Sequence, residues 1–173
     1  MWWRLPYPPK RNADLASLLE RNPPEDVWRS DEAANKLLDQ MAPLHRQRVE
    51  AALADRKWRA GAVFRRIREE KGARIQRAEI RYDGMAGCLR TPAGGSSKQL
   101  LLVTENGRGR LLPLLATEAA RLMGCDDGYV LPPKETAALK VLGDGVSVPV
   151  VRWLGQHLLA PLVSGGATRK AAA

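Results

Sequence analysis

Apolar residues recur at helical spacing in the first third of the chain. Residues 14–19 read as a single helical turn, and a clear amphipathic pattern follows over residues 30–54. Ser30 is suited to cap a helix, and Pro43 is suited to the first turn of the next one. Two consecutive helices are therefore predicted, the second one continuing to about residue 54.

From residue 60 the pattern changes from helical spacing to alternation. It predicts strands over residues 63–68 and 75–82, joined by a loop that contains Gly72. Two shorter apolar runs flank Asn106 and Gly107, a strong hairpin signal for which we expect a loop of more than two residues.

Helical spacing returns near the end of the chain. Residues 118–123 favour a helix that ends at Gly124, and residues 135–142 favour a second that ends at Gly143. Ser147 is a candidate N-cap for a third helix with Pro149 just inside it, and its apolar face comprises Val150, Val151, Leu154 and Leu158. Together these elements predict an α+β fold.

Positive charge is concentrated in the middle of the chain. The formal net charge is +9, and residues 46–81 contain 12 Lys and Arg against 5 Asp and Glu. This block is what a nucleic-acid-binding face needs, because phosphate contacts come from Lys and Arg. A solvated basic surface is an equally good interpretation of the charge alone.

Residues 84–99, which we call the recognition loop, are rich in Gly, Ser and Pro. Glycines allow backbone amides to approach phosphates closely. The loop also has side chains that can donate to phosphate oxygens. The candidate DNA-binding residues are Arg90, Thr91, Gly94, Gly95, Ser96, Ser97 and Lys98. Taken without its neighbours, this stretch is more typical of a flexible surface loop.

Several classes of protein are excluded by composition. The sequence has no long apolar run for a membrane span, and its two cysteines, Cys88 and Cys125, are too few for a disulfide scaffold. His45 and His157 each stand alone, which predicts surface residues and no metal site. A reducing cytoplasm fits this composition.

Two blocks near the C-terminus resemble motifs of the DNA cytosine-5 methyltransferases. The family's ninth motif is matched by Glu118, Ala120, Arg121, Gly124, Asp127 and Tyr129. The tenth is matched by Gly143, Val146 and Pro149, with Asp144 where the family has Asn and Gly145 at its small position. The family's Ser/Thr-Pro cap is absent before Glu118, so Thr117 is expected to cap one turn later.

The resemblance extends to the recognition loop and assigns roles to residues. Leu89, Gly94 and Gly95 match the family's second recognition loop, with Cys88 in place of its threonine. It implies double-stranded DNA as a partner and a structural role for Glu118, Arg121 and Gly124. It also implies that S-adenosylmethionine is bound, in complex with a catalytic half, by Gly143, Asp144, Gly145 and Val146.

The family's catalytic motifs are missing from the sequence. No cysteine follows a proline, and there is no Glu-Asn-Val motif or Phe-x-Gly-x-Gly cofactor loop. The resemblance therefore implies a linker over residues 1–20, a target-recognition domain over 21–112, a C-terminal segment over 113–163 and a disordered tail over 164–173.

The function expected is DNA recognition and structural completion for a cytosine-5 methyltransferase of bacterial or phage type, as found in restriction-modification. The chain is expected to be cytoplasmic and inactive without a complementary catalytic half. Three origins stay open: a split subunit, a gene fragment or a remnant. The alternative function is a basic DNA-binding or scaffold protein with no part in methylation.

Overall fold

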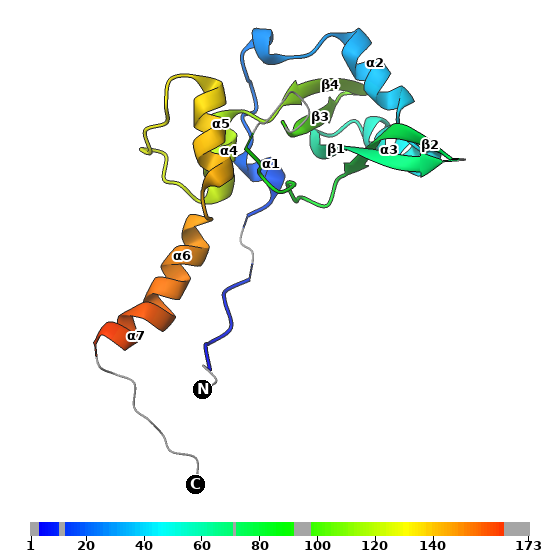
Figure 1. Cartoon of the computed structure of the whole chain (residues 1–173). Helices are drawn as coiled ribbons and strands as arrows, with labels where there is room; N and C mark the ends of the chain where they lie inside the picture. The colour runs from blue at the N-terminus through cyan, green and yellow to red at the C-terminus, as the bar shows by residue number, and fades with distance from the viewer. Residues whose placement is uncertain (1–3, 11–12, 71, 92–97, 165–173) are drawn as a thin grey trace.

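Four antiparallel strands form the centre of the molecule. The computed structural model describes residues 4–10, 13–70, 72–91 and 98–164. The strands lie in the order β2-β1-β3-β4 and comprise β1 (Arg59–Glu70), β2 (Ala73–Arg81), β3 (Leu100–Glu105) and β4 (Arg108–Pro113). With helices packed around this sheet and more helices at the C-terminal end (Figure 1), the predicted α+β class is confirmed.

Strands β1 and β2 extend beyond the rest of the sheet. Strand β3 pairs only with the start of β1, from Arg59 to Val63, whereas β2 pairs with β1 from Ala62 to Glu70. The outer parts of β1 and β2 therefore form a two-stranded arm that projects from the body (Figure 1).

Helices α2 (Asp31–Asp39) and α3 (Pro43–Ala54) cover one face of the sheet. Their predicted starts are confirmed: the Ser30 hydroxyl accepts from the Ala33 amide at 3.3 Å, and Pro43 lies in the first turn of α3. Their apolar side chains bury one core cluster, formed by Ala34, Leu37, Met41, Val49, Val63, Ala78, Ile80, Leu102 and Leu111.

The other face of the sheet packs against α1 (Leu15–Leu18), α4 (Ala116–Met123) and α5 (Glu135–Asp144). The short helix η1 (Glu25–Val27) connects α1 to α2. This second core cluster comprises Leu15, Leu19, Ala60, Ala62, Leu101, Leu112, Leu114, Ala116, Ala119, Ala120, Ala138 and Leu142. Residues from all three predicted segments thus share one core, and the domain boundaries stay a prediction.

Backbone groups on both edge strands are paired with segments outside the sheet. On β2, the Ala78 amide donates to the Gln40 carbonyl at 3.1 Å, and the Ile80 amide donates to His45 Nδ1 at 3.1 Å. On β4, the Leu111 carbonyl accepts from the Arg29 amide at 2.7 Å. His45 is therefore half-buried against the sheet edge, rather than free on the surface as predicted.

The β3–β4 hairpin is tighter than its sequence suggests. Both strands continue up to Asn106 and Gly107, which form a two-residue loop with φ angles of 51° and 80°. Positive φ at both positions is the type I′ geometry, which Asn-Gly favours because its twist matches that of the strands. The prediction of a longer loop was wrong.

Two predicted helix ends also differ. Helix α5 continues through Gly143 to Asp144, because Gly143 serves close packing and does not end the helix. Helix α4 begins at Ala116, so Thr117 lies inside its first turn and is not the cap. By contrast, α4 ends at Gly124 as predicted, with the left-handed φ of 76° that glycine adopts without strain.

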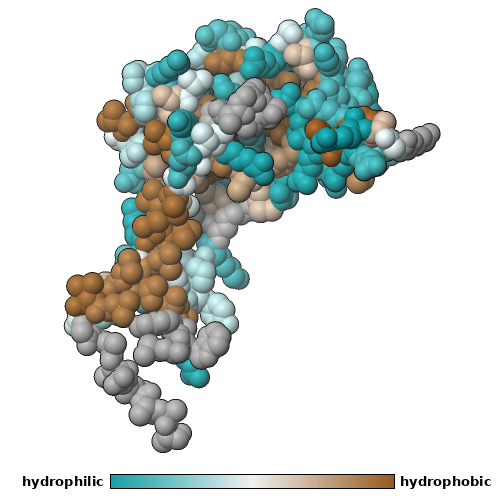
Figure 2. All heavy atoms as spheres, viewed as in Figure 1, coloured by the Kyte–Doolittle hydropathy of each residue, from teal (hydrophilic) through white to brown (hydrophobic). Residues whose placement is uncertain are grey.

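The last helical stretch stands away from the body (Figure 1). It consists of α6 (Val148–Leu154), the π-helical turn η2 (Gly155–Leu159) and α7 (Ala160–Val163). Its apolar side chains form an exposed patch (Figure 2) that includes Val150, Val151, Leu159 and Leu162 at 52%, 50%, 55% and 45% exposure. None of the described helices is long and apolar enough to cross a membrane.

Candidate nucleic-acid interface

The recognition loop begins after β2, and its Gly87 lies against β1 and against the far end of the loop. A side chain at Gly87 would collide with the Phe64 ring of β1. The Gly87 amide donates to Gln99 Oε1 at 3.1 Å, at the other end of the loop. Gly87 is thus required for close approach, and its hydrogen bond joins the two ends of the loop.

The next part of the loop is held by the end of α5. The Thr91 hydroxyl donates to the Asp144 carboxylate. A Cβ at Gly143 would lie 2.6 Å from the Arg90 carbonyl carbon and 2.8 Å from Thr91 Cα, so only glycine fits there. Two residues matched to the tenth motif therefore contact the recognition loop directly.

An open groove of about 580 Å³ lies between the loop and the two-stranded arm. Basic side chains line it from two directions: Arg65 and Arg66 come from β1, and Arg90 and Lys98 come from the loop. The remaining lining residues are Val63, Phe64, Ile67, Gln76, Cys88 and Gln99. The geometry thus brings two predicted DNA-binding residues beside two arginines that are distant in sequence.

Most of the positive charge in this groove is not neutralised by neighbouring carboxylates. Arg66 lies 3.6 Å from Glu79, whereas no ion pair of Arg65, Arg90 or Lys98 occurs within the described part of the chain. Two other arm arginines, Arg68 and Arg77, pair with Glu79 and Glu70. The net charge of the groove lining is consequently positive, which suits a polyanion.

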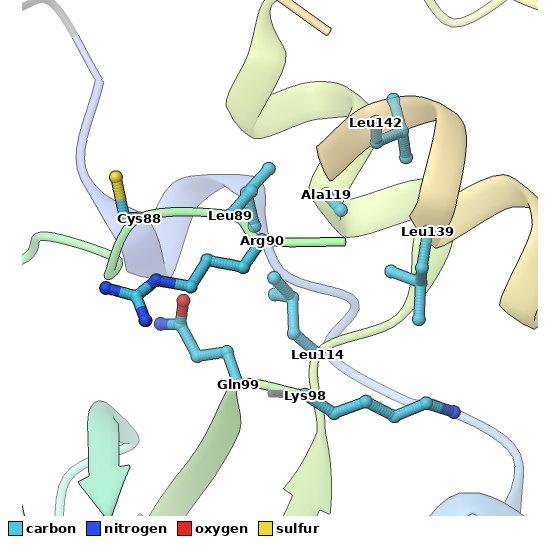
Figure 3. A pocket seen from close by; sticks show the side chains of 9 residues that line it. All are labelled: Cys88, Leu89, Arg90, Lys98, Gln99, Leu114, Ala119, Leu139 and Leu142. Atoms are coloured by element: carbon cyan, nitrogen blue, oxygen red, sulfur yellow. The ribbon is translucent and has the colours of Figure 1, made fainter. Parts of the chain in front are cut away.

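A cavity of about 20 Å³ lies beside the groove, where Arg90 and Gln99 approach each other (Figure 3). This volume is enough for one water molecule. Gln99 Nε2 is buried and has no hydrogen-bond partner among the described residues, while its Oε1 is held by Gly87. The NH₂ group of Gln99 therefore has both of its N–H donors left for a water or a ligand oxygen.

Not every predicted DNA-binding residue falls in this picture. The groove is lined by Arg90 and Lys98, and Thr91 follows Arg90 in the chain. The other predicted residues lie outside the described part of the chain: Gly94, Gly95, Ser96 and Ser97. Sequence reasoning left Arg65 and Arg66 unassigned because their strand shows only a charged face. The basic block over residues 46–81 was the available signal.

Glu118 fastens the N-terminal segment to α4. Its side chain is only 1% exposed, and its two carboxylate oxygens accept from the Glu20 amide at 3.0 Å and the Leu115 amide at 2.8 Å. Burial raises the pKa of this carboxyl above the ordinary glutamate value, although both backbone hydrogen bonds oppose the shift. The carboxylate thus satisfies one orphan amide at the start of α4 and another 98 residues away.

The other two residues assigned a structural role lie nearby. Arg121 Nη1 donates to the Leu18 carbonyl at 3.4 Å and lies 3.7 Å from the Glu20 carboxylate. A Cβ at Gly124 would be 2.7 Å from Cγ of Pro149, so the ninth-motif glycine packs against the tenth-motif proline. Both motifs are therefore joined physically in the fold.

Among the described residues, no group of three or more His, Cys, Asp or Glu side chains is arranged so that it could hold a metal ion.

These features define an α+β chain with a basic groove and a C-terminal segment locked to the loop beside it. Residues 4–160 match the family model for C-5 cytosine-specific DNA methylase, and the chain belongs to that family. DNA is the substrate of this family and S-adenosylmethionine its methyl donor. No curated protein and no solved structure matches the chain.

The four residues predicted to bind S-adenosylmethionine do not enclose a cofactor-sized space by themselves. Asp144 is bonded to Thr91, Gly143 lies against the backbone of Arg90, and Val146 is 66% exposed. They do not fit the whole cofactor without further residues, and their part in binding it stays a prediction.

Proposed function

We propose that the chain recognises double-stranded DNA for a cytosine-5 methyltransferase and completes its structure, with the catalytic motifs supplied by another segment or chain. The observation that carries this proposal is the convergence of Arg65 and Arg66 with Arg90 and Lys98 in one groove. Two of these cations come from β1 and two from the recognition loop. Together they can contact several phosphates along one DNA strand, which none of them could do alone.

The arm gives the groove a shape suited to duplex DNA. The major groove of B-DNA admits a two-stranded β-ribbon, and β1 and β2 form such a ribbon beyond β3. Phosphate contacts from the four groove cations would fix the position of the arm on the duplex, which leaves the other exposed side chains of the arm to face the bases.

Structural completion is proposed for the projecting helix. Its exposed apolar patch, defined by Val150, Val151, Leu159 and Leu162, would pack on the catalytic half. Gly145 and Val146 lie just before it and would then form one wall of the S-adenosylmethionine pocket. In the cell we expect this complex in the cytoplasm, bound to DNA.

A DNA-binding role without methyl transfer is the second candidate. It is favoured by the hydrogen bond from Thr91 to Asp144, because this bond engages a residue that was predicted to bind the cofactor. Methyl transfer to DNA by the chain mixed with a catalytic half would favour the first function, and its absence would favour the second.

Replacing a groove cation with alanine should weaken duplex binding and reduce its salt dependence. For Arg65, Arg66, Arg90 and Lys98, each loss of one phosphate contact should lower the slope of log affinity against log salt by about one unit. Fluorescence anisotropy with a labelled duplex, at several salt concentrations, measures both quantities. Lys36→Ala is the matched control, because Lys36 is an exposed cation of α2 outside the groove lining.

A chemical footprint gives a second readout from the same groove. Cys88 is exposed and lines it, whereas Cys125 is half-buried against the core. Bound duplex should slow alkylation of Cys88 and leave Cys125 unchanged. Unaltered affinity and salt slope in the Arg90→Ala, Lys98→Ala double variant, together with Cys88 alkylation that bound duplex does not slow, would exclude this groove as the DNA site.

A further inference from the structure

A carboxylate lies beside the proposed DNA groove, where its charge opposes phosphate binding. Asp144, the last residue of α5, accepts a hydrogen bond from Thr91, which adjoins the groove residue Arg90. By charge alone, a carboxylate in this place lowers the attraction between the protein and DNA. Its contact with the recognition loop gives it a different role.

The structure around this bond fixes the backbone that bears Arg90. A hydrogen bond to a carboxylate is stronger than one between neutral groups. Gly143 lies against the same part of the loop. A Cβ at this position would be 2.6 Å from the Arg90 carbonyl carbon, so α5 packs directly against the backbone of Arg90. One polar contact and one steric contact therefore hold two successive residues of the loop.

Fixing this backbone matters because an arginine side chain has many rotamers. Ordering such a side chain on binding costs conformational entropy, and a fixed backbone restricts where the guanidinium can reach. We propose that Asp144, through Thr91 and together with Gly143, is a positioning residue that presents Arg90 to DNA phosphates. This inference rests on the proposed function of the groove.

The same contact links DNA binding to the C-terminal segment. Because coupling between two sites is reciprocal, DNA held by Arg90 would in turn stabilise the end of α5 and the residues that follow it. The bond joins residues 53 positions apart and is exposed, so its loss should leave the two core clusters intact.

The test exploits two effects of opposite sign. Asp144→Ala removes both the negative charge and the contact with Thr91. Loss of the charge alone should strengthen DNA binding, whereas loss of positioning should weaken it about three- to tenfold, the worth of one hydrogen bond. Asp144→Asn keeps an acceptor for Thr91 and should bind at least as tightly as the wild type. Likewise, Thr91→Val should weaken binding and Thr91→Ser should not.

A double-mutant cycle then isolates the contact. Thr91→Val combined with Asp144→Ala should bind no more weakly than either single variant, since both remove one interaction. Melting temperatures should be similar for all variants. Unchanged or tighter binding by Asp144→Ala, or additive losses in the double variant, would overturn the positioning role. Arg90→Ala in the same assay reports on the groove itself, so its failure to weaken binding would refute the proposed function as well.

Discussion

Leu154→Asp should abolish rescue of this chain by a catalytic half while leaving duplex binding unchanged. Alone, the chain should self-associate or be poorly soluble and transfer no methyl group, because the apolar face of α6 to α7 is exposed and the Pro-Cys and Glu-Asn-Val motifs are absent. Burial against a partner contributes roughly 1.5–3 kcal/mol for each large side chain. A charge at the half-buried Leu154 would remove most of that gain.

The experiment mixes the purified chain with a separately produced half that carries both missing motifs. Sedimentation measures association, and transfer of labelled methyl groups to DNA measures activity. Gln156→Asp is the control, because it adds the same charge to an exposed polar position of the same helical stretch. If the chain alone is a monodisperse, cooperatively folded monomer that is indifferent to Leu154→Asp, both the interface and the divided enzyme are wrong.

Glu118→Ala should destabilise the fold by about 3 kcal/mol, since it leaves the buried amides of Glu20 and Leu115 without a partner. Glu118→Gln should cost about 2 kcal/mol, because its single oxygen can satisfy one amide while its NH₂ group faces the other. Urea unfolding followed by circular dichroism gives both values.

Glu135→Ala is the informative comparison for Glu118. The Glu135 carboxylate accepts a hydrogen bond from the Ala116 amide at 2.8 Å, at the start of the same helix, but Glu135 is exposed. Its loss should therefore cost less, about 1 kcal/mol. Equal costs for the two glutamates would mean that burial of Glu118 does not matter.

Local signals were enough to predict many elements. Ser30 and Pro43 are cap residues whose preference depends on their own backbone, so the starts of α2 and α3 agree with the structure. Gly124 likewise ends α4 because a left-handed residue is needed there. Alternation predicted the central parts of β1 and β2. Strand β1 extends beyond its predicted range at both ends, whereas β2 begins two residues earlier and ends one residue earlier than predicted.

Features that depend on tertiary packing could not be predicted. Gly143 resembles a helix terminator in sequence, but its lack of a side chain serves the approach of α5 to Arg90, which no local pattern encodes. Arg65 and Arg66 become part of the candidate site only because the fold places this part of β1 and the recognition loop around the same groove. His45 contacts β2 for the same reason: the turn between α2 and α3 lies at that edge.

The pairing of both sheet edges restricts how a chain with an exposed apolar helix can associate with itself. The segments at Gln40 and His45 occupy part of the β2 edge, and the Arg29 amide occupies a carbonyl of β4. A further strand cannot add at those points without displacing them. Self-association of the isolated chain should therefore occur through the exposed helix. It should be reversed by mild detergent and should not show the dye binding of cross-β fibrils. Chains that associate in this way could still bind a catalytic half afterwards.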